Sequence, residues 1–332
     1  VFTAGVLQFV VQLPALRRLG LLPRPRWAWR DVRVQRIFRL MIPVLIGSSV
    51  AQVSLLLNSN LSTHFGDGSV SWLYYANRLM EFPLGIFSIA VGTAILPTLS
   101  AQHATADGAR FSATLDWALR AILIIGLPAA IGMVVAAAPL VAVVYGHGRF
   151  SLHDVTMTTW ALWAYGLGFM GFSLVKVLLP GFYARQETRL PVRYAIIGLC
   201  TGMAASLALF AVHRRLGFEG AHVGLAVSTS LTAWVNAALL LRRLRRDGIY
   251  RPAPGWMRFS GQILLASLLM CGVVVWLDRP VTDWLVLKPW ARGGHLLVLI
   301  VAAIVVYGLT LLATGFRARH LRPQHARADS PR

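Results

Sequence analysis

VSWLYYANRLMEFPLGIFSIAVGTAILPTL (residues 70–99) carries an arginine and a glutamate inside an otherwise apolar run. The run is long enough to cross a bilayer, for which about 20 helical residues suffice. Arg78 lies about 13 Å from the start of the run, at about 1.5 Å per helical residue. An arginine at that depth costs at least about 2.5 kcal/mol on insertion scales, and it usually faces a wet cavity, a partner helix or a charged substrate.

Other polar residues share a helix face with Arg78. Glu81 lies three residues further on, and Asn77 and Tyr74 extend the strip. Two interpretations stay open, a polar site on a cavity wall and a structural ion pair that locks two helices, and charge within the membrane favours the first. Because a guanidinium binds phosphate oxygens in a bidentate manner, an anionic substrate could displace Glu81 as the partner of Arg78.

A proline follows this strip at once. The ring of Pro83 clashes with the carbonyl group of Leu79 and removes a hydrogen bond, so the sequence predicts a kink here. Pro83 and Gly85 are therefore the candidate hinge residues of this segment.

Composition and periodicity predict an all-α polytopic membrane protein. The 332 residues are 57% hydrophobic and 13% charged, with a mean hydropathy of +0.64, whereas soluble domains carry about 25% charged residues. The apolar runs are continuous rather than alternating, which is typical of helices and not of barrel strands. No loop between them has room for a soluble catalytic domain, which disfavours a membrane enzyme. Nine transmembrane segments are expected, one of them partial: 1–16, 38–63, 70–98, 116–145, 156–180, 192–213, 220–241, 259–277 and 295–315.

The net charge of +20 has a topological explanation. Most basic residues lie on every second loop and in the tail. This is the positive-inside pattern, so the basic loops and the C-terminus are expected on the cytoplasmic side. The same placement argues against a nucleic-acid partner and points to membrane lipids instead.

Three further polar residues lie within or beside the segments. Lys176 is either a second cationic group for a substrate or a side chain that snorkels to the interface. Gln52 belongs to a polar face of the second segment, which either lines a wet cavity or forms hydrogen bonds between helices. Arg120, at the inner edge of the fourth segment, is interpreted as an interfacial anchor. No cofactor is expected, and no metal-ligand spacing occurs in the sequence.

Two long motifs resemble signatures of one family. YYANRLMEFPLGIFSIAVGTAILPTLS (74–100) and KVLLPGFYARQETRLPV (176–192) are similar to two motifs of the MurJ/MviN family of lipid II flippases, which belongs to the MOP exporter superfamily. Weaker similarities occur in VLQFVVQLPALRRLG (6–20) and PGWMRF (254–259). The resemblance covers essentially the whole chain.

The resemblance implies a layout in six parts. These are a partial transmembrane helix at 1–16, a basic cytoplasmic loop at 17–37, a six-helix C-terminal lobe at 38–245, a cytoplasmic linker at 246–258, an extra transmembrane pair with a lipid-tail groove at 259–316, and a cytoplasmic tail at 317–332. The first lobe of the family is absent, so an N-terminally truncated chain is expected.

The resemblance also implies a transporter rather than an enzyme. It would move the undecaprenyl-diphosphate-linked peptidoglycan precursor from the inner to the outer leaflet of the bacterial inner membrane, by alternating access through a cationic cavity. Arg78 matches the cavity arginine and Glu81 its acidic neighbour, while Asn77 stands where relatives often carry aspartate. The alternatives are another exporter of the superfamily, for drugs or polysaccharide-linked lipids, and a non-transporting scaffold for cell-wall synthesis proteins.

Overall fold

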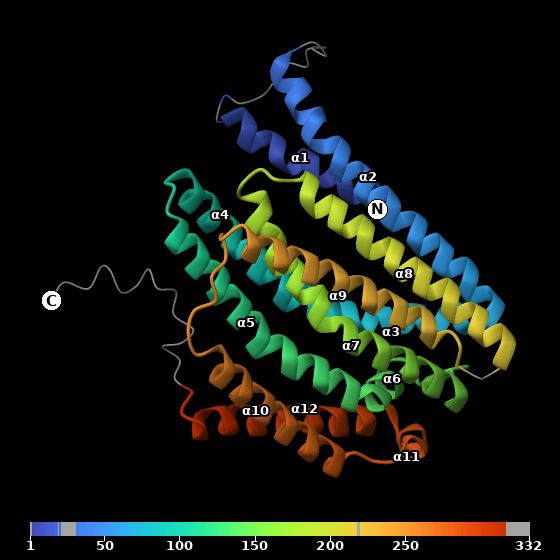
Figure 1. Cartoon of the computed structure of the whole chain (residues 1–332). Coiled ribbons are helices and arrows are strands. Elements are labelled where there is room, and N and C mark those ends of the chain that lie inside the picture. Colours follow the sequence, from blue (N-terminus) through green and yellow to red (C-terminus); the bar gives the residue numbers. More distant parts are fainter. Residues whose placement is uncertain (1, 19, 21–30, 218–219, 317–332) are drawn as a thin grey trace. The chain divides into compact units, whose positions relative to one another are not determined.

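The computed structural model describes residues 2–18, 20, 31–217 and 220–316, and its regular structure within these ranges is helical (Figure 1). This confirms the predicted all-α class. The helices run in the order α1 (Phe2–Arg18), α2 (Val32–Ser62), η1 (Thr63–Phe65), α3 (Ser69–Pro83), η2 (Leu84–Ile89), α4 (Ala90–Ala104), α5 (Gly108–Val135), α6 (Ala137–Tyr145), α7 (Leu152–Tyr183), α8 (Arg189–Leu216), α9 (Val223–Arg246), α10 (Trp256–Leu277), α11 (Val281–Val286) and α12 (Pro289–Ala313).

The chain divides into two compact units, Val1–Ile42 and Pro43–Arg332. The division falls inside α2, and all contacts between helices given below lie within the second unit. Most of the loop predicted at 17–37, and the whole tail predicted at 317–332, lie outside the described residues.

Seven described ranges are long and apolar enough to cross a membrane, and each overlaps one of the last seven predicted segments. They are Ser69–Ala104, Gly108–Val135, Leu152–Tyr183, Arg189–Arg215, Val223–Arg246, Trp256–Leu277 and Pro289–Ala313. The first two predicted segments fall on α1 and α2.

The fourth predicted segment is interrupted. Residues 116–145 form two helices, α5 and α6, because Ala136 leaves the helical conformation at φ −90° and ψ 19°. Pro139 explains the interruption, since it has no N–H to donate to the carbonyl group of Val135.

The third segment changes its helical type after Pro83. Residues Leu84–Ile89 form the π-helical segment η2, which connects α3 to α4. A π-helical turn is a recognised cause of bending, so the backbone departs from α-helix where the sequence predicts a kink. Along α3, η2 and the start of α4, buried residues recur at every fourth position: Trp72, Ala76, Met80, Leu84, Ser88 and Gly92.

Helix α7 is the central element of the second unit, and it packs against α3, α5 and α9 (Figure 1). Glycine makes the closest of these approaches possible. A Cβ atom on Gly168 would lie 2.8 Å from the backbone Cα of Ser230 on α9, and one on Gly171 would lie 3.0 Å from the backbone nitrogen of Trp234. The glycines of the stretch GLGFMG (166–171) therefore allow the close packing of α7 against α9.

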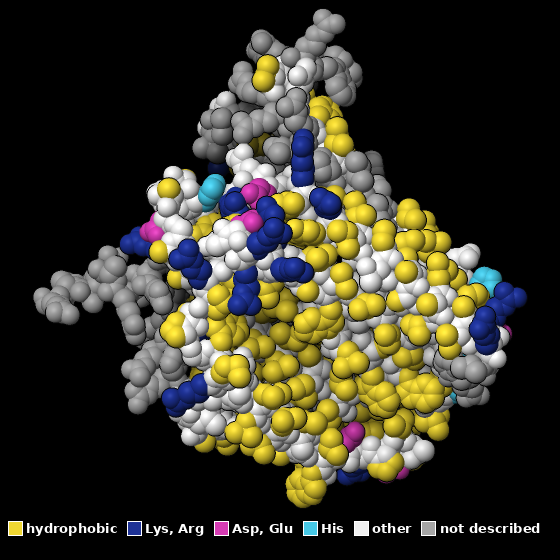
Figure 2. All heavy atoms as spheres, viewed as in Figure 1, with side chains coloured by type: hydrophobic (Ala, Val, Ile, Leu, Met, Phe, Trp, Pro, Cys, Tyr) yellow, Lys and Arg dark blue, Asp and Glu magenta, His cyan; other side chains and the backbone are white. Residues whose placement is uncertain are grey.

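The last helices pack together on one side of this unit. Helix α10 contacts α12 and α5, and α12 also contacts α6 (Figure 1). Figure 2 shows a broad hydrophobic surface with Lys and Arg gathered toward one end of it. Exposed arginines lie at the end of α9 and in the loop after it: Arg242, Arg245, Arg246 and Arg251.

Candidate functional site

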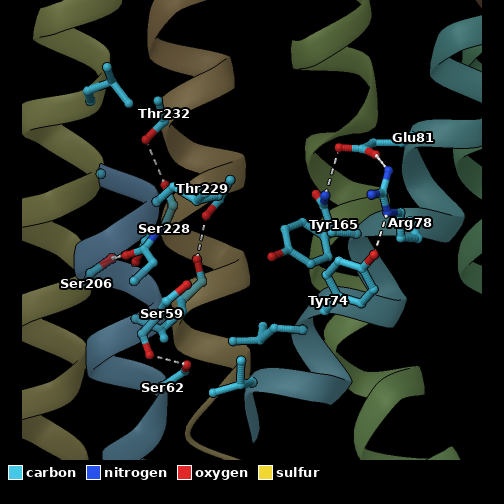
Figure 3. A pocket seen from close by; sticks show the side chains of 18 residues that line it. Ser59, Ser62, Tyr74, Arg78, Glu81, Tyr165, Ser206, Ser228, Thr229 and Thr232 are labelled. Carbon is cyan, nitrogen blue, oxygen red and sulfur yellow. Dashed lines mark hydrogen bonds and ion pairs between the residues drawn. The ribbon is translucent and has the colours of Figure 1, made fainter. Parts of the chain in front are cut away.

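The polar strip predicted on residues 74–81 forms one hydrogen-bonded group on α3 (Figure 3). Arg78 Nε donates to the Tyr74 hydroxyl at 3.2 Å, and a terminal guanidinium nitrogen donates to Glu81 Oε2 at 3.1 Å. Asn77 Nδ2 donates to Glu81 Oε1 at 2.9 Å. The guanidinium also lies 5.2 Å from the Tyr74 ring centroid, within cation–π range. The cation is therefore oriented by its own helix.

This group lines a cavity of about 450 Å³ that helices α2, α3, α7, α8 and α9 enclose. Arg78 and Glu81 keep 58% and 47% of their side-chain surface exposed, so both remain accessible from the cavity. Tyr165 of α7 also lines it. The helices bring together residues from almost the whole length of the lobe: Leu55, Asn58, Ser59, Ser62, Val70, Leu73, Tyr74, Asn77, Arg78, Glu81, Tyr165, Leu199, Gly202, Ser206, Leu225, Ser228, Thr229 and Thr232.

Helices α8 and α9 supply four hydroxyl side chains to the lining, together with Leu199, Gly202 and Leu225 (Figure 3). Ser228 and Thr232 donate to backbone carbonyls one helical turn earlier, at 2.8 Å and 3.1 Å, and Thr229 does the same at 2.8 Å. Ser206 donates to the side-chain oxygen of Asn58 at 3.3 Å. Because the hydroxyl protons are used within the protein, these oxygens offer mainly acceptor lone pairs to a ligand.

The charges of the described lining balance. Arg78 is its one cation and Glu81 its one anion, and the two are paired. Because the pair is exposed it is weak, so a phosphate can replace the carboxylate at little cost. The described cavity wall therefore presents a free positive charge to a ligand only when the ion pair between Arg78 and Glu81 is broken.

Two predicted site residues do not line the cavity. Gln52 is exposed and is not a lining residue; the nearest lining residue on α2 is Leu55, three residues or about 4.5 Å further along the helix. Lys176 is exposed on α7, eleven residues or about 16 Å beyond Tyr165. The carbonyl group of Lys176 instead marks a close approach of α4, because a Cβ atom on Gly92 would lie 2.7 Å from it.

The hydroxyl residues of α8 and α9 were not predicted as site residues. Ser206 ends the stretch GLCTGMAAS (198–206), and Gly202 of this stretch packs closely against Thr232 of α9. Ser228 and Thr232 are four residues apart, a spacing that places them on one helix face. That spacing was the available signal, but nothing in it says which face borders a cavity.

A second polar cluster joins α3 to α7 at the start of both helices. Trp72 Nε1 donates to Asp154 Oδ1 at 2.8 Å, and Asp154 completes a capping box with Ser151. The buried ring of His222 lies against Trp72 and is 3.0 Å from the carbonyl oxygen of Met157. Burial lowers the pKa of His222, and this outweighs the opposing effect of its hydrogen bond to Met157.

No group of three or more His, Cys, Asp or Glu residues that could hold a metal ion occurs in the described part of the chain.

Comparison with known proteins agrees with this architecture. The family model described as lipid II flippase MurJ matches residues 1–292. The chain belongs to the lipid II flippase MurJ family. Curated relatives with that name or the name "probable lipid II flippase MurJ" include proteins of Haemophilus influenzae (40% identical), Vibrio cholerae (41%) and Burkholderia cenocepacia (38%), each matched over 97% of this chain.

The chain spans 60–62% of the length of these MurJ relatives. Solved structures that share its fold include two transporters. A lipid II flippase MurJ in an inward closed conformation has a TM-score of 0.66 and 21% identity, over 92% of this chain and 59% of that one. An outward-facing multidrug resistance transporter of the MATE family has a TM-score of 0.53 and 16% identity, over 87% and 65%.

Proposed function

We propose that this chain forms the second lobe and the extra helix pair of a lipid II flippase of the bacterial inner membrane, with the basic loops and the C-terminus in the cytoplasm. Its substrate is the undecaprenyl-diphosphate-linked peptidoglycan precursor, which moves from the inner to the outer leaflet. The activity is transport and not catalysis. The observation that carries the proposal is the accessible, oriented guanidinium of Arg78 on the wall of the 450 Å³ cavity.

The head group of such a lipid cannot cross hydrocarbon unaided, because unpaired charge in a medium of low dielectric costs many kcal/mol. Arg78 supplies a fork of N–H donors in place of water. The acceptor oxygens of Ser206, Ser228 and Thr229 suit the hydroxyl and amide donors of the sugar and peptide. The prenyl tail stays in lipid beside α10 and α12, whose exposed faces are apolar.

Transport by alternating access requires one lobe to rock against the other around a fixed site. Pro83 and Gly85 are the proposed hinge residues, because the π-helical segment η2 begins directly after Pro83 and contains Gly85. The lobe that would oppose this one belongs to the part of the family's length that the chain does not span.

A chimera tests the proposal. The N-terminal part of the Haemophilus influenzae relative is joined to this chain at the start of the matched region, and the product is expressed in cells depleted of their own flippase. Exposure of the precursor at the outer leaflet is then measured. We expect the chimera to restore it, and we expect Arg78→Ala, Arg78→Glu and Arg78→Lys to lower the rate.

Arg78→Ala removes charge-assisted hydrogen bonds to the substrate, so it should lower the rate by about 10- to 100-fold. Arg279→Ala is the matched control, because Arg279 is exposed in the loop after α10 and does not line the cavity. Full flipping by all three Arg78 variants would exclude the role given to this residue.

A further inference from the structure

A buried carboxylate fastens the loop between α9 and α10 to α5. Asp116 of α5 is only 5% exposed, yet its two oxygens accept four hydrogen bonds. Oδ1 accepts from Trp256 Nε1 at 2.7 Å, from the Tyr250 hydroxyl at 2.9 Å and from the backbone nitrogen of Ala253 at 3.2 Å. Oδ2 accepts from Arg120 Nε at 2.8 Å. Three of the four donors come from the loop and the first turn of α10.

The side chain of Arg120 binds the backbone of the same loop. One terminal nitrogen of its guanidinium donates to the carbonyl groups of Pro254 at 3.1 Å and Ala253 at 3.5 Å. The guanidinium carbon lies 5.2 Å from the Trp256 ring centroid and 5.1 Å from that of Phe259. Its side chain keeps only 15% of its surface exposed, so Arg120 is not simply an anchor that reaches out to the interface.

We name the Asp116–Arg120 pair and its loop contacts the clasp. Desolvating two opposite charges is unfavourable unless further hydrogen bonds satisfy both groups, and here the loop supplies those bonds. A second contact lies next to the clasp, where Ser112 Oγ donates to the Arg251 carbonyl at 3.2 Å and accepts from the Arg251 nitrogen at 2.9 Å. The short connection between the lobe and the extra pair is thus tied to α5 at two places.

Other contacts hold the extra pair along its length. Near the middle, the Tyr307 hydroxyl of α12 donates to the carbonyl group of Ile124 on α5 at 2.6 Å. At the opposite end from the clasp, Arg292 of α12 donates to the carbonyl groups of Gly146, directly after α6, and Leu285 of α11. Of these described contacts, only the clasp includes an ion pair.

We propose that Asp116 and Arg120 are positioning residues for transport, which make α10 and α12 move with the lobe as one body. The inference rests on the proposed function. One lipid molecule would contact the cavity wall with its head and the surface of α10 and α12 with its tail. The distance between these two surfaces must therefore stay constant while the lobe rocks. The clasp provides that constraint where the chain would otherwise have a hinge.

Hydrogen–deuterium exchange of the chain in lipid nanodiscs tests the clasp without any transport assay. The variants are Asp116→Asn and Arg120→Gln. The matched control is Arg110→Gln, which removes an exposed pair with Asp107 from the same helix. We expect amides of residues 247–259 to exchange at least tenfold faster in both clasp variants, with amides of α7 and α9 unchanged and the control like the parent.

Tyr250→Phe covers the case in which a clasp variant fails to fold. It removes a single donor to Asp116 and should raise exchange of the same amides at least twofold. Unchanged exchange of residues 247–259 in every variant that folds would overturn the clasp.

The chimera then tests the positioning role. We expect Asp116→Asn and Arg120→Gln to lower flipping at least tenfold and Arg120→Lys to restore part of it, while Arg110→Gln flips normally. A loosened loop with full flipping would overturn the positioning role. An inactive chimera carrying the unaltered chain would instead count against the proposed function, and the exchange result would stand on its own.

Discussion

Replacing Gly168 by alanine should separate α7 from α9, and the structure gives the size of the effect. The added Cβ atom would lie 2.6 Å from the Cβ and 2.8 Å from the Cα of Ser230. Carbon atoms in contact are normally about 3.5–4.0 Å apart, so the two helices must move apart by about 1 Å. The second of these atoms belongs to the backbone and cannot turn away.

Two terms add to the cost of Gly168→Ala. Overpacking of a tight interior costs about 1–3 kcal/mol. The shift also strains the bond that Ser230 Oγ donates to the carbonyl group of Ala164 at 2.7 Å, which is worth about 1 kcal/mol. We therefore expect Gly168→Ala to lower the free energy of unfolding by about 2–4 kcal/mol.

Gly272→Ala is the matched control, because a Cβ atom on Gly272 of α10 would have no neighbour within 4 Å. Alanine is favoured over glycine in a helix by about 0.5–1 kcal/mol, so this change should be neutral or stabilising. Unfolding of the purified chain in mixed detergent micelles measures both. The reasoning is refuted if the two variants unfold alike.

Three further predictions rest on single contacts. Trp72→Phe removes the donor to Asp154 while keeping an apolar ring, and it should lower the free energy of unfolding by about 1.5–3 kcal/mol; a loss below that of Ser100→Ala, an exposed site on α4, would contradict it. Because the pKa of His222 is lowered in the fold, its contribution to stability is complete above pH about 6.5 and is lost as the pH falls toward its folded value, so His222→Gln should reduce the loss of unfolding free energy between pH 7.5 and 5; an unchanged pH dependence in the variant would contradict this. Glu81→Gln leaves Arg78 with no paired carboxylate in the cavity, and it should tighten binding of a diphosphate lipid to the chain severalfold in a nanodisc titration; weaker binding would show that Glu81 helps to present the cation.

Sequence reasoning located the long apolar helices because length and hydropathy decide them, but not the break at Ala136 or the short helix α11. It also located Arg78 and Glu81, because a charged pair inside an apolar run is conspicuous by itself. Asp116 and Arg120 are also an oppositely charged pair, four residues apart at the edge of an apolar run. The sequence analysis nevertheless interprets Arg120 without its partner Asp116. Its remaining partners lie more than 130 residues away in the chain, and only the tertiary structure brings them to α5.

The cavity lining was harder to predict for a related reason. A serine or threonine in a membrane helix can satisfy its own donor on the preceding turn, as Ser228 does, and this leaves no sign of what lies beyond it. Lys176 and Gln52 were proposed on their chemistry, and their distance along the helix from the lining could not be judged without knowing which turn borders the cavity.

Buried residues recur at every fourth position from Trp72 to Gly92, and this fixes which face of the third span is buried along the whole stretch. In a regular α-helix each step of four overshoots a full turn by about 40°, so five steps would rotate the last member about 200° away from α7. The π-helical segment Leu84–Ile89 has more residues per turn than an α-helix. It therefore removes about 100°, or half, of that rotation. Deleting one residue there would turn α4 by the same angle about its own axis, and Gly92 would no longer meet the Lys176 carbonyl. The length of this single segment thus decides whether the two halves of the span can face α7 together.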